Sequence, residues 1–165
     1  MCAGLPQQWW SKLKLSTPDQ FHYLNKGCTQ YFTNNDSKLN ANRKSLDHQK
    51  KGPLRDAIVD DINDFIATDS ALKHFDVNEN ERFEIYKIVA AVLHLGNISF
   101  EESPEDSHGG CRVSRTSNGS LEIAAKLIGI DPDELQQSLL SRVMQTSKGG
   151  HKGTVYMVCY FELFV

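Results

Sequence analysis

The glycine-rich run Ser147-Lys148-Gly149-Gly150-His151-Lys152-Gly153-Thr154 is the part of the sequence whose residue types first suggest chemistry. A phosphate-binding Walker loop needs Gly-Lys followed directly by Ser or Thr, so that the lysine meets phosphate and the hydroxyl meets magnesium. Here the order is Lys152-Gly153-Thr154, and no strand-then-helix pattern surrounds it. Nucleotide binding by this loop is therefore not expected.

Histidine and cysteine spacing gives no metal or catalytic motif. None of the six histidines forms the i, i+4 pair of a metalloprotease helix. His94 lies in an apolar run and is expected to be a hydrogen-bonded core residue. The cysteines, far apart and without a CxxC pair, are expected to be free thiols: Cys2, Cys28, Cys111 and Cys159. A Cys-His nucleophile stays open, because its partners need not be close in sequence, but we assign no catalytic, cofactor-binding or metal-binding residue.

The composition is that of an ordinary soluble protein, with 39% hydrophobic and 24% charged residues and a net charge of -3. This balance gives no general attraction to nucleic acid or membrane. Charge is nevertheless uneven: residues 26–51 hold six basic and two acidic residues, and residues 53–106 hold four basic and thirteen acidic ones. No apolar run is long enough to span a bilayer and no signal peptide is recognisable, which predicts a cytosolic protein without membrane insertion.

Local patterns predict several elements in the first half of the chain. Thr17-Pro18-Asp19-Gln20 has the form of a capping box and predicts a short helix or turn. Residues 28–52 are rich in Asn, Ser, Lys and Gln and predict a long exposed basic loop. A surface helix is expected from Pro53, with Ile58, Ile62, Phe65 and Ile66 on its buried stripe.

The second half predicts more helices and one hairpin. Asn78 is expected to cap a helix that Gly96 closes, and its segment Ile88 to Leu95 is apolar on nearly every side, so it must be covered by further protein. After this helix, an extended segment is expected over residues 97–100 and an acidic loop over residues 101–110. Helices are then expected over 120–128 and from Asp131 to about 141, and strands over 142–146 and 154–158 with a basic tip. The predicted fold class is mainly α with this short β-hairpin.

Three sequence motifs resemble the motor domain of myosins. Ile88-Val89-Ala90-Ala91-Val92-Leu93-His94-Leu95-Gly96-Asn97-Ile98-Ser99-Phe100 is similar to a helix and exit strand of the upper motor subdomain. Cys2-Ala3-Gly4 and Phe21-His22-Tyr23-Leu24-Asn25 resemble two family elements in the same order. Residues 1–158 thus resemble part of a motor domain, and the resemblance implies helices of the upper subdomain, packed against the remaining motor subdomains.

Within that family, the loop Gly149-Gly150-His151-Lys152-Gly153-Thr154-Val155 and two further segments resemble class VI motors. Gly27-Cys28-Thr29-Gln30-Tyr31-Phe32 and Asn42-Arg43-Lys44-Ser45 are similar to an insert peculiar to that class, which implies that residues 28–52 lie near the nucleotide pocket. The hairpin of residues 142–158 falls where the family has an actin-facing loop. The resemblance implies F-actin as a partner. It also implies actin contacts at Arg142, Lys148, His151 and Lys152, and a phosphorylation site at Thr154.

The resemblance implies an actin-activated Mg-ATPase as the parent motor, in the cytoplasm and associated with the cytoskeleton. The Walker, switch I and switch II motifs do not occur in the chain, so it is expected to bind no cofactor and to be inactive alone. Residues 159–165 depart from the family, which suggests truncation or a gene-model error. The alternative is a small independent helical module that binds partners through its basic loop and acidic helix.

Overall fold

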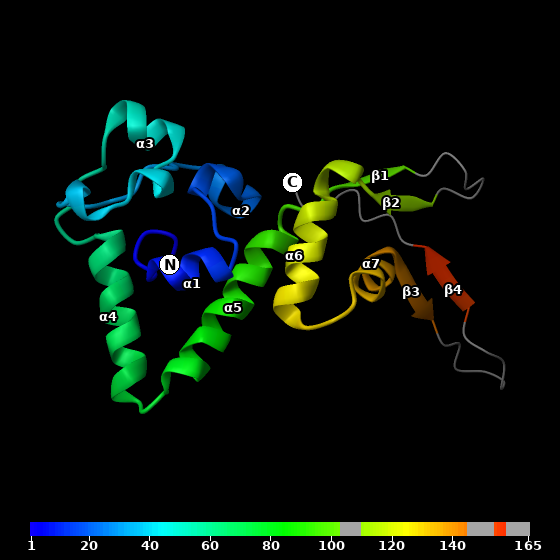
Figure 1. The fold of residues 1–165 in the computed structure, drawn as a ribbon. Helices are drawn as coiled ribbons and strands as arrows, with labels where there is room; N and C mark the ends of the chain where they lie inside the picture. The colour runs from blue at the N-terminus through cyan, green and yellow to red at the C-terminus, as the bar shows by residue number, and fades with distance from the viewer. Residues whose placement is uncertain (103–109, 145–153, 158–165) are drawn as a thin grey trace. The chain divides into compact units, whose positions relative to one another are not determined.

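The computed structural model describes residues 1–102, 110–144 and 154–157, and this part of the chain is mainly helical (Figure 1). The predicted fold class is therefore confirmed. Contacts divide the chain into two compact units, Met1–Leu93 and His94–Val165. Each unit has buried apolar residues of its own.

The first unit holds short helices followed by two long ones. Its elements are α1 (Gln7–Lys12), the 3-10 turn η1 (Pro18–Gln20), α2 (His22–Asn25), the 3-10 turns η2 (Asp36–Lys38) and η3 (Ala41–Arg43), α3 (Leu46–Lys51), α4 (Asp61–His74) and α5 (Glu79–Leu95), whose last two residues belong to the second unit. At η1 the predicted turn is present. The predicted capping box is wrong, because the Thr17 side chain makes no capping hydrogen bond.

Helices α4 and α5 run in opposite directions and diverge from the turn that joins them (Figure 1), and one carboxylate bridges the two helices. Asp69 Oδ1 on α4 accepts hydrogen bonds from Arg82 Nε (3.0 Å) and Tyr86 Oη (3.1 Å) on α5. The predicted cap of α5 is confirmed: Asn78 Oδ1 accepts the backbone N–H of Glu81, and the Glu81 carboxylate accepts that of Asn78. This reciprocal capping box fixes where α5 begins.

The start of α4 corrects the helix predicted from Pro53. Residues 53–60 are not helical, because Leu54 joins a parallel β-bridge with Phe32 and Asp60 caps the helix that begins at Asp61. Ile62 and Phe65 are buried as predicted, whereas Ile58 and Ile66 are 89% and 50% exposed. Long-range pairing of Leu54 thus overrides the local helical period.

The segment of residues 28–52, called the 28–52 segment below, is only partly the exposed loop that the sequence predicts, because several of its side chains are buried. It contains η2, η3 and α3, with connecting turns. Its buried side chains are Thr29, Tyr31, Thr33, Leu39, Arg43, Ser45 and His48. The prediction of exposure is wrong for these residues because it followed polar composition. Several of their polar groups are buried with hydrogen-bond partners, as described below, whereas Tyr31 Oη and Arg43 Nε are buried without one.

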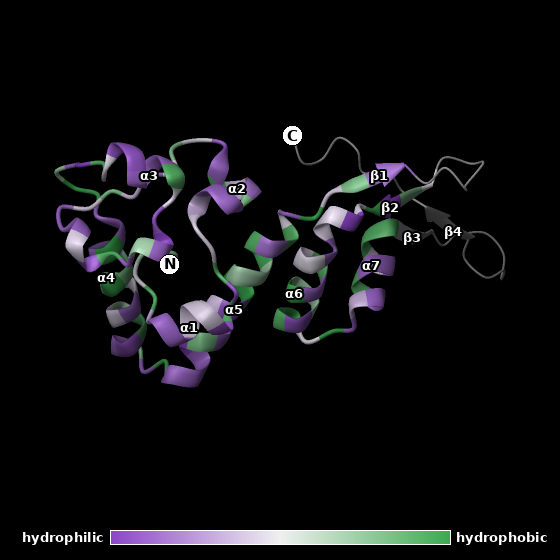
Figure 2. Cartoon of the chain, turned by 45° about the horizontal axis from the view of Figure 1, so that its top comes forward, coloured by the Kyte–Doolittle hydropathy of each residue, from purple (hydrophilic) through white to green (hydrophobic). Residues whose placement is uncertain are grey.

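Part of the apolar face of α5 is left open, as the sequence predicts for a helix that further protein must cover. Ile88, Val89 and Val92 are 63%, 45% and 48% exposed. Figure 2 shows the hydrophobic residues in the second half of α5, in contrast to the hydrophilic α3. None of the helices in the described ranges is long and apolar enough to cross a membrane.

The second unit packs two helices against a short hairpin. Strands β1 (Phe100–Glu102) and β2 (Cys111–Val113) are antiparallel, followed by the 3-10 turn η4 (Arg115–Ser117), α6 (Asn118–Ile128) and α7 (Pro132–Leu140). As predicted, Gly129 ends α6 with φ of 87°, and Asp131 caps α7 through the backbone N–H groups of Asp133 and Glu134. His94 is buried, as expected of a core residue. The extended segment expected over residues 97–100 is only partly right, because among these residues only Phe100 lies in a strand. Strand β2 was not predicted.

The structure explains why the third residue of the Cys-Ala-Gly motif, Gly4, is a glycine. A Cβ built on Gly4 would lie 2.6–2.8 Å from side-chain atoms of Phe65, whose own side chain is buried. No real Cβ contact is that short, so residue 4 must lack a side chain for α4 to pack against the N-terminal segment.

We expect Gly4→Ala to lower the free energy of unfolding by about 1–3 kcal/mol, because it overpacks this contact. Gly27→Ala is the matched control, since nothing lies within 4 Å of its Cβ position. Phe65→Leu should reduce the cost of Gly4→Ala in a double-mutant cycle measured by chemical denaturation. Equal stability of Gly4→Ala and Gly27→Ala would contradict the steric explanation.

Candidate functional site

The hairpin predicted near the C-terminus is present as β3 (Ser141–Met144) and β4 (Thr154–Met157) (Figure 1). Its antiparallel register pairs Arg142 with Tyr156 and Met144 with Thr154. Residues two apart lie on the same face of a strand, so positions 142 and 154 share one face of the ladder as diagonal neighbours. Diagonal positions of this kind are about 7–8 Å apart.

The other predicted contact residues of this hairpin lie outside the described residues. These are Lys148, His151 and Lys152, and the divergent tail over 159–165 lies there too. The described ladder therefore brings together Arg142 and Thr154 alone among the five predicted residues.

A second candidate region is the 28–52 segment, which is organised around a buried histidine. His48 is 1% exposed, and its Nδ1 accepts the backbone N–H of Tyr31 at 3.1 Å. Its Nε2 lies 2.7 Å from Asp36 Oδ1. Because Nδ1 accepts, Nε2 carries the proton and donates to Asp36, which fixes the tautomer. His48 thereby links α3 to η2 and to the start of the segment.

Asp36 completes this cluster at the edge of the segment. Its second oxygen, Oδ2, lies 2.6 Å from Lys44 Nζ. The hydrogen bond from Lys44, and after it the one from His48, holds the pKa of the Asp36 carboxyl below its usual value. The charged carboxylate is thus the form that this arrangement favours.

Arg43 ties the 28–52 segment to the N-terminal residues. It is 4% exposed, and Nη1 donates to the Ala3 carbonyl while Nη2 donates to Gln7 Oε1, both at 3.0 Å. Its guanidinium also lies 5.3 Å from the centre of the Trp10 ring, within the range of a cation–π contact. Burial lowers the pKa of Arg43 from its ordinary value.

Two aspartates at the start of α4 anchor the other side of the segment. Asp60 Oδ2 accepts the backbone N–H of Asn34 at 3.2 Å, and Asp61 Oδ2 accepts that of Phe32 at 2.7 Å. Asp60 Oδ1 caps α4 by accepting from Ile62 and Asn63. The backbone N–H of Asn63 is the main cause that lowers the pKa of Asp60.

These contacts position backbone and are not arranged as a catalytic site. Within the described ranges, no group of three or more His, Cys, Asp or Glu side chains could hold a metal ion. The sequence also lacks a Walker pattern. No step of ATP chemistry is assigned to the described residues.

Sequence reasoning missed the buried roles of Arg43, His48 and Asp60. An Asp before a helical run is a capping signal, so Asp60 could have been found from the sequence. For His48 and Arg43 no local signal exists, because their partners lie 17 and 40 residues away.

Comparison with known proteins covers nearly the whole chain. The family model described as myosin head (motor domain) matches residues 1–159. Myosin heavy chain 95F of Drosophila melanogaster is 51% identical over 160 residues, which are 96% of this chain and 13% of that protein. Unconventional myosin-VI of Homo sapiens is 46% identical over 160 residues, 96% of this chain and 12% of that protein. Myosin-17 of Arabidopsis thaliana is 30% identical over 146 residues, 88% of this chain and 8% of that protein.

The chain thus spans only 12–13% of the length of the two relatives that it matches at 46% and 51% identity. The family model nevertheless covers far more than half of the chain, and it includes all three motifs that resemble myosins. The chain belongs to the myosin head (motor domain) family.

Proposed function

We propose that this chain is part of an actin-based motor of the myosin VI type, whose complete form couples hydrolysis of Mg-ATP to movement on actin filaments. The observation that carries this proposal is the identity of 46–51% to two relatives, a myosin-VI and myosin heavy chain 95F, against 30% to a plant myosin. An independent binding module is not favoured, because the family match extends over residues 1–159.

In this motor the chain contributes scaffold of the upper subdomain. The exposed apolar residues Ile88, Val89 and Val92 are the surface through which α5 packs on the remaining motor subdomains. Burial of such residues stabilises by about 25 cal/mol per Å² of apolar surface, which favours a covered helix. The motor works in the cytoplasm, in association with the cytoskeleton.

The 28–52 segment is proposed to be the class VI insert near the nucleotide pocket. The hydrogen bond of Arg43 to Ala3 packs it against the rest of the first unit, and that of His48 to Asp36 joins residues within it. Removing the whole segment would therefore remove buried side chains as well as any influence on nucleotide exchange. Substitutions of its exposed residues test that influence more cleanly.

The β3–β4 hairpin is proposed to contact F-actin through Arg142, Lys148, His151 and Lys152. Thr154 is proposed to be phosphorylated. Support comes from the register, in which positions 142 and 154 are diagonal neighbours on one face. A phosphate adds about 1.5 to 2 negative charges, enough to pair with nearby bases in the loop.

Thr154→Glu and Thr154→Ala in the complete motor are expected to differ in actin-activated ATPase activity, and more so at low salt, because exposed charges are screened as ionic strength rises. Alanine at Arg142, Lys148 or Lys152 should weaken actin affinity, measured by co-sedimentation, and leave the basal ATPase nearly intact. Lys126→Ala on α6 serves as a control for loss of an exposed positive charge elsewhere. Equal activation of both Thr154 variants would remove the phosphorylation proposal, and unchanged actin affinity of the alanine variants would remove the contact surface.

A further inference from the structure

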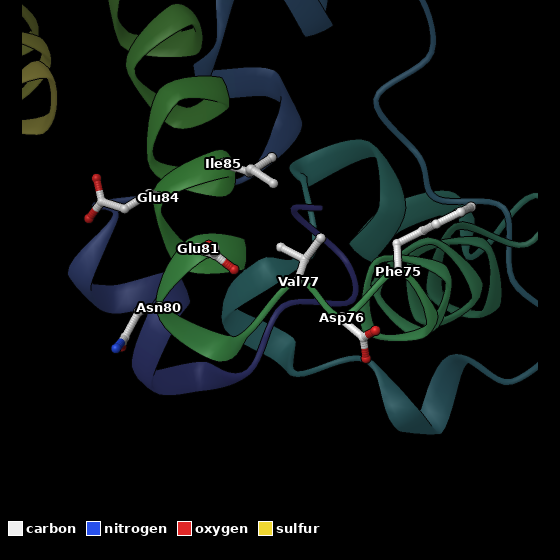
Figure 3. A pocket seen from close by; sticks show the side chains of 7 residues that line it. All are labelled: Phe75, Asp76, Val77, Asn80, Glu81, Glu84 and Ile85. Carbon is white, nitrogen blue, oxygen red and sulfur yellow. The ribbon is translucent and has the colours of Figure 1, made fainter.

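A shallow depression lies where α4 turns into α5, within the first unit (Figure 3). Its volume is about 570 Å³, and it is open to solvent. Phe75, Val77 and Ile85 form its apolar part, and Asp76, Glu81 and Glu84 its acidic part. We call these six residues the α4–α5 groove. Figure 3 shows Val77 and Ile85 directed toward the space between the two helices.

The large apolar side chains of the groove are exposed to solvent. Phe75 is 81% exposed and Ile85 is 40% exposed. Exposed apolar residues that lie together and are rimmed by polar ones are typical of interaction sites. The α4–α5 groove therefore has the composition of a docking surface.

The turn that carries these side chains is held by its own hydrogen bonds. Asp76 has φ of 56°, in the left-handed region, and the N–H of Val77 bonds the Leu72 carbonyl at 3.1 Å. This is the pattern of a Schellman turn at the end of α4. With the Asn78–Glu81 capping box directly after it, the groove is preorganised, which reduces the entropy cost of binding.

The charge of the groove is negative. Its six residues include three carboxylates and no base. One carboxylate oxygen of Glu81 accepts the backbone N–H of Asn78, and Glu84 is paired with the neighbouring Lys87 at 2.6 Å. Lys73 on α4 is engaged with Asp69 at 2.7 Å. Asp76 and Glu81 thus leave a net negative rim beside an apolar floor.

We propose that the α4–α5 groove binds a basic peptide segment of a partner protein. One large apolar side chain of that segment lies against Phe75, Val77 and Ile85. Its flanking lysine or arginine residues face Asp76 and Glu81. The negative rim selects this partner over an acidic or neutral segment, because complementary charge adds to specificity and to the rate of association.

The test measures binding to the full chain by fluorescence anisotropy. The probe is a labelled peptide with one leucine flanked on each side by a pair of lysines. We expect saturable binding that weakens as salt is raised. Matched peptides with serine in place of leucine, or glutamate in place of lysine, should each bind at least about tenfold more weakly.

Two variants of the chain separate the apolar and acidic contributions. Phe75→Ser with Ile85→Ser should raise the Kd at least about tenfold at every salt concentration. Asp76→Asn with Glu81→Gln should raise the Kd at low salt and flatten its salt dependence. Asparagine is tolerated in the left-handed region, and glutamine can keep the hydrogen bond of the capping box. The control is Glu122→Gln with Ile128→Ser on α6, which removes one exposed carboxylate and one exposed apolar side chain elsewhere.

Circular dichroism and thermal melts must show that each variant retains the fold of the wild-type chain. Equal Kd values for the groove variants and the α6 control would overturn the proposal. So would the absence of saturable binding of the lysine–leucine peptide. Concentration-dependent self-association that the Phe75 and Ile85 substitutions abolish would also overturn it, because the groove would then be occupied by a second copy of the chain.

Discussion

His48→Ala is expected to lower the free energy of unfolding by about 3–5 kcal/mol, the range for removing a large buried ring. The substitution leaves a cavity at a position that is 1% exposed. It also removes the acceptor of the Tyr31 backbone N–H and the donor to Asp36. A buried N–H without a partner costs about 1–3 kcal/mol, so little of the loss can be recovered by relaxation.

Chemical denaturation of His48→Ala and wild type measures this effect. Lys50→Ala, on the exposed side of the same helix α3, is the control and should change stability by less than about 0.5 kcal/mol. Hydrogen exchange gives a local readout, because the Tyr31 amide should lose protection in His48→Ala before the amides of α5 do. A stability loss equal to that of Lys50→Ala would show that the 28–52 segment is not packed around His48.

Asp60→Ala is expected to lower the free energy of unfolding by about 2–4 kcal/mol. The change removes the cap of α4, which is worth about 1 kcal/mol. It also removes a charged acceptor from the backbone N–H of Asn34, and hydrogen bonds to charged groups contribute about 1.5–3 kcal/mol each. Asp60→Asn should fall between Asp60→Ala and wild type. Asp133→Ala, an exposed Asp in the first turn of α7, should have a much smaller effect.

The same residue predicts a pH dependence. Backbone N–H donors, with Asn63 first, hold the folded-state pKa of Asp60 below its usual value. A lowered carboxyl pKa contributes stability that is fully present above the unfolded-state pKa and is lost as pH falls through the folded-state pKa. The stability difference between wild type and Asp60→Asn should therefore be constant above about pH 5 and shrink below about pH 4. Denaturation curves over this range test it, and a difference independent of pH would contradict the role of the Asp60 charge.

The expected effects of His48→Ala and Asp60→Ala concern the proposed role of the 28–52 segment in the motor. Asp60 and Asp61 connect it to α4, and Arg43 connects it to Ala3 and Gln7. A segment held at both sides can transmit a constraint to whatever part of the motor it faces, whereas a loose loop cannot. Its proposed influence on nucleotide exchange would then depend on these anchors, so loss of stability and altered exchange should accompany each other in Asp60→Ala.

Elements with local signals were predicted well from the sequence. The cap of Asn78, the Asp131-Pro132 start of α7 and the Gly129 end of α6 each involve residues within a few positions of one another. Hydrogen bonds of this kind depend on the backbone near them and on little else. The apolar run of α5 was also recognised from the sequence, and its residues Ile88 and Val92 are exposed in this chain, while the covering partner stays a prediction.

The sequence by itself therefore determined the mainly helical class, most helix boundaries in the second unit, the backbone of the β3–β4 hairpin and the family of the chain. Only the tertiary structure decided that the 28–52 segment is packed, that residues 53–60 are not helical and that β2 pairs with β1. The contacts responsible join residues far apart in sequence, such as Arg43 with Ala3 and Leu54 with Phe32. A polar side chain is equally compatible with water and with a buried partner, so its burial is decided only when folding brings that partner within hydrogen-bond distance.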